Sequence, residues 1–240
     1  MKYIIFYSIL PFSTFLFSQQ VIDSNEQKIE FILDSAFNMC KYDDDMNKAM
    51  NVVDVGLKLI EQSPKANIRQ CIKGLYIKGR IYENQVNYKS EYEILDSAIL
   101  LSEKHNLDTG SIYGRILLHF ANSCIKNSNY HLSYKPLMTS KRIFNSLNDK
   151  NNGLLQNSYL IEYYYHSNQF EEGDKLIQLV ENNLDSTYDS TYKYYFYKQV
   201  ADFYWKLNIF DKANFYQDLL YNHEYTDERN KCALIINKLH

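Results

Sequence analysis

The chain has 240 residues, of which 45% are apolar, 15% aromatic and 23% charged, and its formal net charge is −3. Its 7 glycines and 3 prolines are too few for a collagen-like chain, for low-complexity linkers or for most all-β folds, and its 23 tyrosines argue against disorder. Because this charge provides no basic surface for duplex nucleic acid, no nucleic acid partner is expected.

The first residues are typical of a secretory signal peptide. One positive charge precedes a mostly apolar stretch from Tyr3 to Phe17, which is shorter than the roughly 20 apolar residues of a membrane-spanning helix. Ser18 then provides a small residue before a cleavage point. We therefore expect residues 1–18 to be a signal peptide and residues 19–240 to be a periplasmic or secreted domain with no membrane partner. An uncleaved N-terminal anchor is the alternative.

A short polar break that ends in a large apolar or aromatic residue recurs along the rest of the chain. We call these final residues the turn anchors; they are Met46, Tyr88, Tyr130, Phe170 and Phe210. Their spacings are 42, 42, 40 and 40 residues, which indicates five repeats in step.

The residues at fixed distances from the turn anchors also agree. Six positions before each anchor stand Cys40, Tyr82, Cys124, Tyr164 and Tyr204. Three positions after each anchor stand Ala49, Glu91, Ser133, Gly173 and Ala213, of which four are small. Positions three, seven and ten after an anchor lie on one face of a helix, so the pattern predicts two helices that approach closely through small residues.

This pattern resembles tetratricopeptide (TPR) repeats, which have a small residue and then Tyr in the first helix, an aromatic at the turn, and small, large and small residues in the second. The resemblance covers about residues 26–222, although the repeats exceed the family's usual length of about 34 residues and mostly lack its Trp and Pro. It implies an all-α, right-handed superhelix of about five antiparallel helix pairs, a TPR-like α-solenoid, with an added C-terminal helix. In its expected export and its repeat length, the chain also resembles the exported sensory regions of bacterial membrane-bound regulators. Some of these regulators carry an AraC-type DNA-binding end.

The repeat register also predicts where the helices lie. The helix pairs are expected near residues 25–42 and 45–62, 66–85 and 88–104, 109–127 and 130–147, 152–167 and 170–184, and 188–207 and 211–222. A last helix near 226–239 is apolar over much of its surface, so we expect either that a partner docks on it or that the chain is truncated there. Pro136 lies inside the sixth helix, which should either kink or begin late, near Ser133.

The sequence contains no phosphate-binding loop, nucleophile elbow, zinc-protease motif or calcium loop, and no cofactor or metal is expected. Cys40, Cys71, Cys124 and Cys232 are far apart, so buried packing is favoured over a disulfide, which an exported chain would still permit. The run of three acidic residues at 43–45 is interpreted as a helix start rather than as a calcium site.

A solenoid of this type offers a concave face lined by first helices, where a peptide would bind. The repeat register places twelve candidate partner-binding residues on that face: Lys73, Tyr76, Arg80, Asn84, Arg115, Asn122, Lys126, Glu162, Tyr165, Lys198, Asp202 and Trp205. Lys73, Arg80, Arg115 and Lys126 are hypothesised to clamp an acidic group. A charged, solvated helix face with no ligand is the alternative.

These observations favour a non-catalytic module that binds a protein or peptide in the periplasm. The alternative is the sensory portion of a membrane-bound transcription regulator or signalling protein, whose membrane span and output domain lie outside this chain. An enzyme such as a hydrolase is the weakest of the three hypotheses, because nothing in the sequence provides a catalytic constellation.

Overall fold

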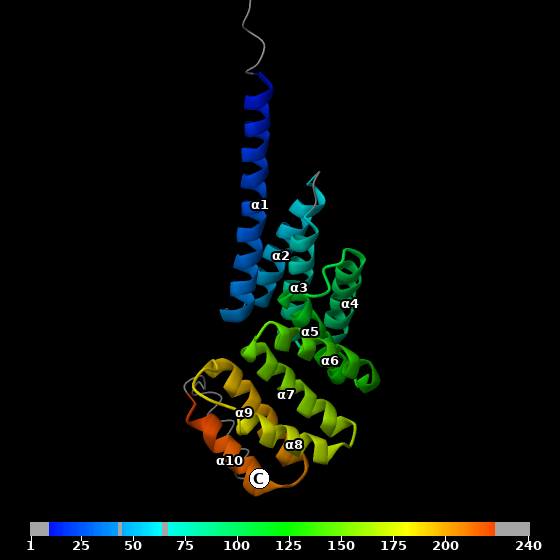
Figure 1. Cartoon of the computed structure of the whole chain (residues 1–240), viewed down its shortest axis with the longest axis vertical. Helices are drawn as coiled ribbons and strands as arrows, with labels where there is room; N and C mark the ends of the chain where they lie inside the picture. The colour runs from blue at the N-terminus through cyan, green and yellow to red at the C-terminus, as the bar shows by residue number, and fades with distance from the viewer. Residues whose placement is uncertain (1–9, 43–44, 64–66, 224–240) are drawn as a thin grey trace, which may run out of the picture. The chain divides into compact units, whose positions relative to one another are not determined.

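The computed structural model describes residues 10–42, 45–63 and 67–223, and within them every regular element is an α-helix (Figure 1). The helices are α1 (Leu10–Tyr42), α2 (Met46–Glu61), α3 (Ile68–Asn84), α4 (Tyr88–Lys104), α5 (Ser111–Lys126), α6 (Tyr130–Ser146), α7 (Lys150–His166), α8 (Phe170–Glu181), α9 (Ser190–Lys206) and α10 (Phe210–Tyr221). None of these helices combines the length and the apolar character needed to cross a membrane.

The helices of the described residues correspond to the predicted pairs, and from α2 onward each end lies within three residues of its predicted position. The start of α1 was predicted wrongly: the helix begins at Leu10 and not near residue 25. Its sequence contains no glycine, and Pro11 lies in the first turn, where a missing backbone N–H costs nothing. The predicted helix 226–239, with its docking surface and Cys232, lies outside the described residues.

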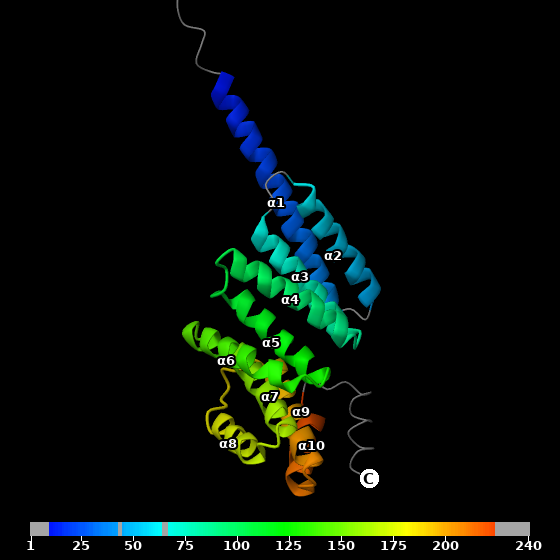
Figure 2. The same ribbon diagram turned by 90° about the vertical axis from the view of Figure 1, so that its right-hand side faces the viewer.

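The chain divides into two compact units, an N-terminal unit of residues 1–90 and a C-terminal unit of residues 91–240. In the N-terminal unit, α1 packs against both α2 and α3. In the C-terminal unit, α5 pairs with α6, α7 with α8 and α9 with α10. The first helices of these pairs also lie side by side, because α7 contacts both α5 and α9 (Figure 2).

The cores of both units use the predicted repeat positions. All five residues three positions after the turn anchors are buried, and Gly173 shows why most of them are small. A Cβ atom on Gly173 would lie 2.7 Å from the ring of Phe203, so this ring from α9 packs too closely on α8 there for a larger side chain. Cys40 and Cys124, which occupy the position six before an anchor, are buried as predicted. Cys71 is half-buried, and all three are free thiols.

The turns that follow α3, α5, α7 and α9 each contain a residue with left-handed backbone, two positions before the turn anchor. These residues are Val86, Ser128, Asn168 and Asn208, with φ between 57° and 61°. The backbone N–H of the next residue then donates to a carbonyl five residues back: Gln169 to Tyr164 at 2.8 Å and Ile209 to Tyr204 at 2.9 Å. This arrangement satisfies the last carbonyls of the first helix and fixes the length of the polar break.

Two further predictions concern helix starts. The side chain of Asp45 accepts a hydrogen bond of 2.9 Å from the backbone of Lys48, so this part of the acidic run caps α2 as predicted. The late start of α6 near Ser133 is wrong, since α6 begins at Tyr130 and continues through Pro136. Pro136 has no backbone N–H, so the carbonyl of Leu132 lacks its usual helical donor there.

Candidate functional site

Polar side chains recur at two positions of the first helices, eight and four residues before the turn anchor. Residues four apart lie on one face of a helix, and α5, α7 and α9 lie side by side. In the C-terminal unit these positions form a row across three helices, which we call the inner ladder: Asn122 and Lys126 on α5, Glu162 and His166 on α7, and Asp202 and Lys206 on α9.

The centre of the inner ladder is a nearly buried carboxylate. Glu162 is 4% exposed, and Lys126 Nζ lies 2.6 Å from its Oε1 atom. His166 Nε2 lies 3.9 Å from the same oxygen. Lys126 thus connects α5 to α7 and provides the cation that a buried carboxylate requires.

His166 is held between aromatic rings. Its imidazole stacks on Tyr130 with ring centroids 4.6 Å apart and meets Tyr165 edge-on at 5.1 Å. Partial burial lowers the pKa of His166 below its usual 6.5; the Glu162 carboxylate opposes this shift, and Lys206 and Lys126 reinforce it. The imidazole is therefore neutral at pH 7 and can accept or donate a hydrogen bond.

The α9 end of the ladder carries both signs of charge. Desolvation by the surrounding protein raises the pKa of the Asp202 carboxyl, and Lys198 and Lys206 oppose this shift. Asp202 as a whole residue is nevertheless exposed. Lys206 Nζ lies 4.8 Å from the centre of the Tyr165 ring, which is a cation–π distance. The three helices thus present alternating charges between aromatic rings on one surface.

The remaining candidates in the C-terminal unit border this row. Trp205 is half-buried, and its ring packs edge-on against Phe210 at 5.1 Å. Asn122 is buried at 3% exposure, whereas Arg115 is half-buried near the start of α5. The hypothesis that Trp205 anchors a partner therefore concerns only the exposed part of its ring.

In the N-terminal unit the four candidates all lie on α3 and mostly contact α1. Lys73 forms ion pairs with Glu30 and with Asp34, the latter at 2.6 Å. Asn84 donates a hydrogen bond of 2.8 Å to the carbonyl of Cys40 on α1.

The other two α3 candidates are held within the unit as well. Tyr76 is buried at 4% exposure beside Phe37, and Arg80 pairs with Glu83. Of the four cations in the hypothesised acidic clamp, Lys73, Arg80 and Lys126 therefore already have carboxylate partners, and two of the four belong to each unit.

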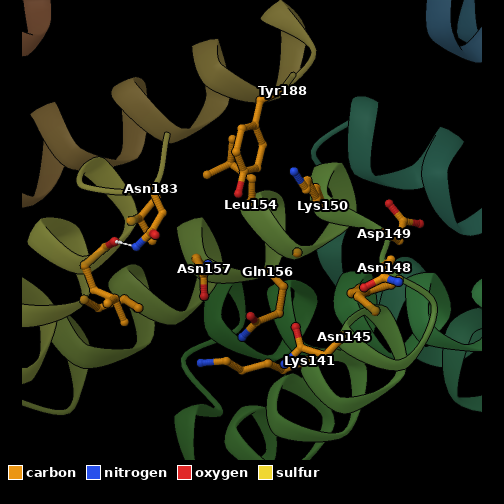
Figure 3. A pocket seen from close by; sticks show the side chains of 15 residues that line it. Lys141, Asn145, Asn148, Asp149, Lys150, Leu154, Gln156, Asn157, Asn183 and Tyr188 are labelled. Carbon is orange, nitrogen blue, oxygen red and sulfur yellow. Dashed lines mark hydrogen bonds between the residues drawn. The ribbon is translucent and has the colours of Figure 1, made fainter. Parts of the chain in front are cut away.

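A cavity of about 440 Å³ in the C-terminal unit was not predicted (Figure 3). It lies between α6, α7, α8 and the segment that leads into α9, and five carboxamide side chains line it. One sequence signal could have revealed it. Gln156 stands fourteen residues before its turn anchor, where two other repeats have Ile116 and Phe196, both fully buried.

No protein-family model matches the sequence, and no curated protein sequence matches it either. Solved structures do resemble it. BtubC (BKLC) from P. vanneervenii matches with a TM-score of 0.64 at 13% identity, over 92% of this chain and 93% of that chain. A single-residue variant of a Podosopora anserina kinesin light chain with nearly identical TPR-like repeats matches with a TM-score of 0.63 at 11% identity, over 88% of this chain and 96% of that one.

Another structure of the same Podosopora anserina repeat protein gives a TM-score of 0.60 at 12% identity, again over 88% of this chain and 96% of that chain. At such low identities the likeness concerns the fold. The chain is thus an all-α, TPR-like solenoid built from successive packed helix pairs.

Proposed function

We propose that this chain is a non-catalytic interaction module and that it binds an extended peptide segment of a partner protein along the inner ladder. The observation that carries the proposal is the alignment of charged and amide side chains on three adjacent first helices. Six residues at two fixed repeat positions form one continuous polar row, and its central carboxylate is 4% exposed. An extended chain that crosses these helices would meet a new pair of polar side chains at each repeat.

The charges and polar groups of the inner ladder determine which peptide features it favours. Lys126 is engaged by Glu162, whereas Lys206 at the α9 end of the row is exposed and favours an acidic side chain of the peptide. Lys198, which is exposed one helical turn before Asp202 on α9, adds to this preference. The neutral imidazole of His166 suits backbone groups of the ligand. Trp205 and Tyr165 provide aromatic surface beside these polar groups, a combination that is common in interfaces.

Selection from a displayed random peptide library tests this function. Peptides enriched on the wild-type protein should share an acidic residue, and Lys206→Glu should weaken their binding at least tenfold. Lys175→Glu is the matched control, because Lys175 is an exposed lysine on α8, a second helix. Peptides that bind wild type, Lys206→Glu and Lys175→Glu equally would contradict the assignment of the inner ladder.

The compartment is proposed on sequence alone. The short apolar stretch that ends at Phe17 and the small Ser18 support export with cleavage after residue 18. N-terminal sequencing of the protein recovered from the periplasm of an expressing bacterium should begin at Gln19. Recovery of uncleaved chain from the membrane fraction would contradict this proposal.

A further inference from the structure

The cavity between α6, α7 and α8 has features of a small-molecule site that is separate from the inner ladder (Figure 3). Its volume of about 440 Å³ lies in the range of ligand pockets in general, about 300–1,000 Å³. Leu154 and Tyr188 give it apolar and aromatic surface, and carboxamides from α6, α7 and the following turns provide polar groups. It shares no residue with the inner ladder.

Buried amide atoms at this cavity have no hydrogen-bond partner. Gln156 is fully buried, and both its Nε2 and its Oε1 atoms are unpaired. The Oδ1 atom of the neighbouring Asn157 is buried and unpaired as well. Burying polar atoms without a partner is unfavourable, and two other repeats avoid this by placing Ile116 and Phe196 at the position of Gln156. A ligand that pairs with these atoms would account for a polar side chain in a core position.

The charges around the cavity limit what that ligand can be. Both carboxylate oxygens of Asp149 accept hydrogen bonds from Asn152, at 3.1 and 2.7 Å. Asp149 is therefore already engaged and is poorly placed to hold the ammonium group of an amino acid. Lys141 and Lys150 also line the cavity, so its charge is compatible with neutral or acidic ligands.

We propose that this cavity binds a carbohydrate of one or two sugar rings. A hydroxyl group donates and accepts at once, so neighbouring sugar hydroxyls can serve the Gln156 N–H, the Gln156 carbonyl and the Asn157 carbonyl together. The ring of Tyr188 offers an apolar surface for the C–H face of a sugar. An extended peptide instead requires a continuous groove, and this cavity is bounded by the α6–α7 turn and by the segment before α9.

Saturation-transfer NMR and calorimetry on the whole protein test the proposal. The probes are hexoses, N-acetylhexosamines, hexuronic acids and their disaccharides at millimolar concentration, with trialanine and adenosine as comparison ligands. At least one sugar should bind, and Gln156→Met should weaken its binding at least tenfold while the melting temperature stays equal or rises. A loss of binding together with a lower melting temperature would mean that Gln156 is structural and would overturn the assignment.

A second variant closes the cavity without touching the unpaired amides. Nothing lies within 4 Å of a Cβ atom on Gly153, so Gly153→Leu should fill the space, keep the fold and abolish sugar binding. Lys206→Glu, on the inner ladder, should leave sugar binding unchanged. The proposal is overturned if no sugar of the panel binds, if trialanine or adenosine binds in place of sugars, or if Gly153→Leu binds the sugar as wild type does.

Discussion

Val86 occupies a backbone conformation that its side chain disfavours. Its φ of 58° lies in the left-handed region, where the other described residues of this kind are asparagines and a serine. Valine is β-branched and 67% exposed, so it is strained in this turn and contributes little burial. Val86→Asn should therefore raise the free energy of unfolding by about 1 kcal/mol, measured by urea denaturation.

The equivalent turn in a later repeat provides the reverse experiment. Asn168 has φ 57° at the same repeat position, so Asn168→Val should lower the free energy of unfolding by about 1 kcal/mol. A lower free energy of unfolding for Val86→Asn would contradict the claim that the left-handed backbone strains valine at this turn position.

Gly173 and Gly153 differ in the space around them. A Cβ atom on Gly173 would lie 2.7 Å from the buried Phe203 ring, whereas one on Gly153 meets nothing within 4 Å. Gly173→Ala should thus destabilise the protein by about 1–3 kcal/mol, while Gly153→Ala should stabilise it by up to about 1 kcal/mol through helix propensity. Thermal unfolding of the two variants checks this, and equal effects would contradict the close packing of the Phe203 ring against Gly173.

At the scale of the residue, the sequence predicted the features that recur in every repeat, and it missed a feature that occurs in one repeat. The turn anchors were found because the same short polar break precedes each of them. Gln156 was missed because a single glutamine in a helix indicates an exposed position unless it is compared with Ile116 and Phe196 at the same repeat position.

At the scale of the helix, the ion pair between Lys126 on α5 and Glu162 on α7 can be broken from either side. The two single variants should lower the free energy of unfolding by different amounts. The Glu162 side chain is 5% exposed and that of Lys126 is 33% exposed. Lys126→Met leaves a buried carboxylate without its cation, at a cost of about 3 kcal/mol. Glu162→Gln should cost less, because the freed lysine can reach water, and the double variant should recover part of the loss. A larger cost for Glu162→Gln than for Lys126→Met, measured by urea unfolding, would contradict this picture.

His166 should make the stability depend on pH. Its pKa in the folded protein lies below the usual 6.5, so the unfolded chain binds the proton first as the pH falls. The free energy of unfolding should therefore decrease as the pH is lowered from above 6.5 to the folded pKa, and His166→Asn should remove this part of the dependence. NMR titration of the imidazole checks the direction. Lys126→Met should raise the pKa and Glu162→Gln should lower it, whereas a wild-type pKa above 6.5 would refute the prediction.

The bounds between first and second helices were predictable because α3, α5, α7 and α9 each end in a left-handed turn that the sequence marks. The start of α1 was not, because Asp23, Ser24 and Asn25 are residue types that commonly cap a helix start, whereas the helix continues back to Leu10. Which polar residues on the first helices meet was also open from the sequence. The repeat register placed Lys126 and Glu162 on one face, but only the contact between α5 and α7 shows that they neutralise one another.

At the scale of the molecule, the repeats form two compact units, and the inner ladder belongs to the C-terminal unit. The repeat pattern predicted a binding surface on the first helices. The proposed partner-binding row within it follows from the polar positions that α5, α7 and α9 bring together.

The most direct test of this account is to map a bound peptide on the protein by backbone amide NMR. A peptide selected for its affinity should perturb the amide signals of α5, α7 and α9 around Lys126, Glu162 and Lys206, and should leave α6, α8 and α10 nearly unchanged. Perturbations confined to α6, α8 and α10 would place the binding surface on the second helices and would contradict the proposed function.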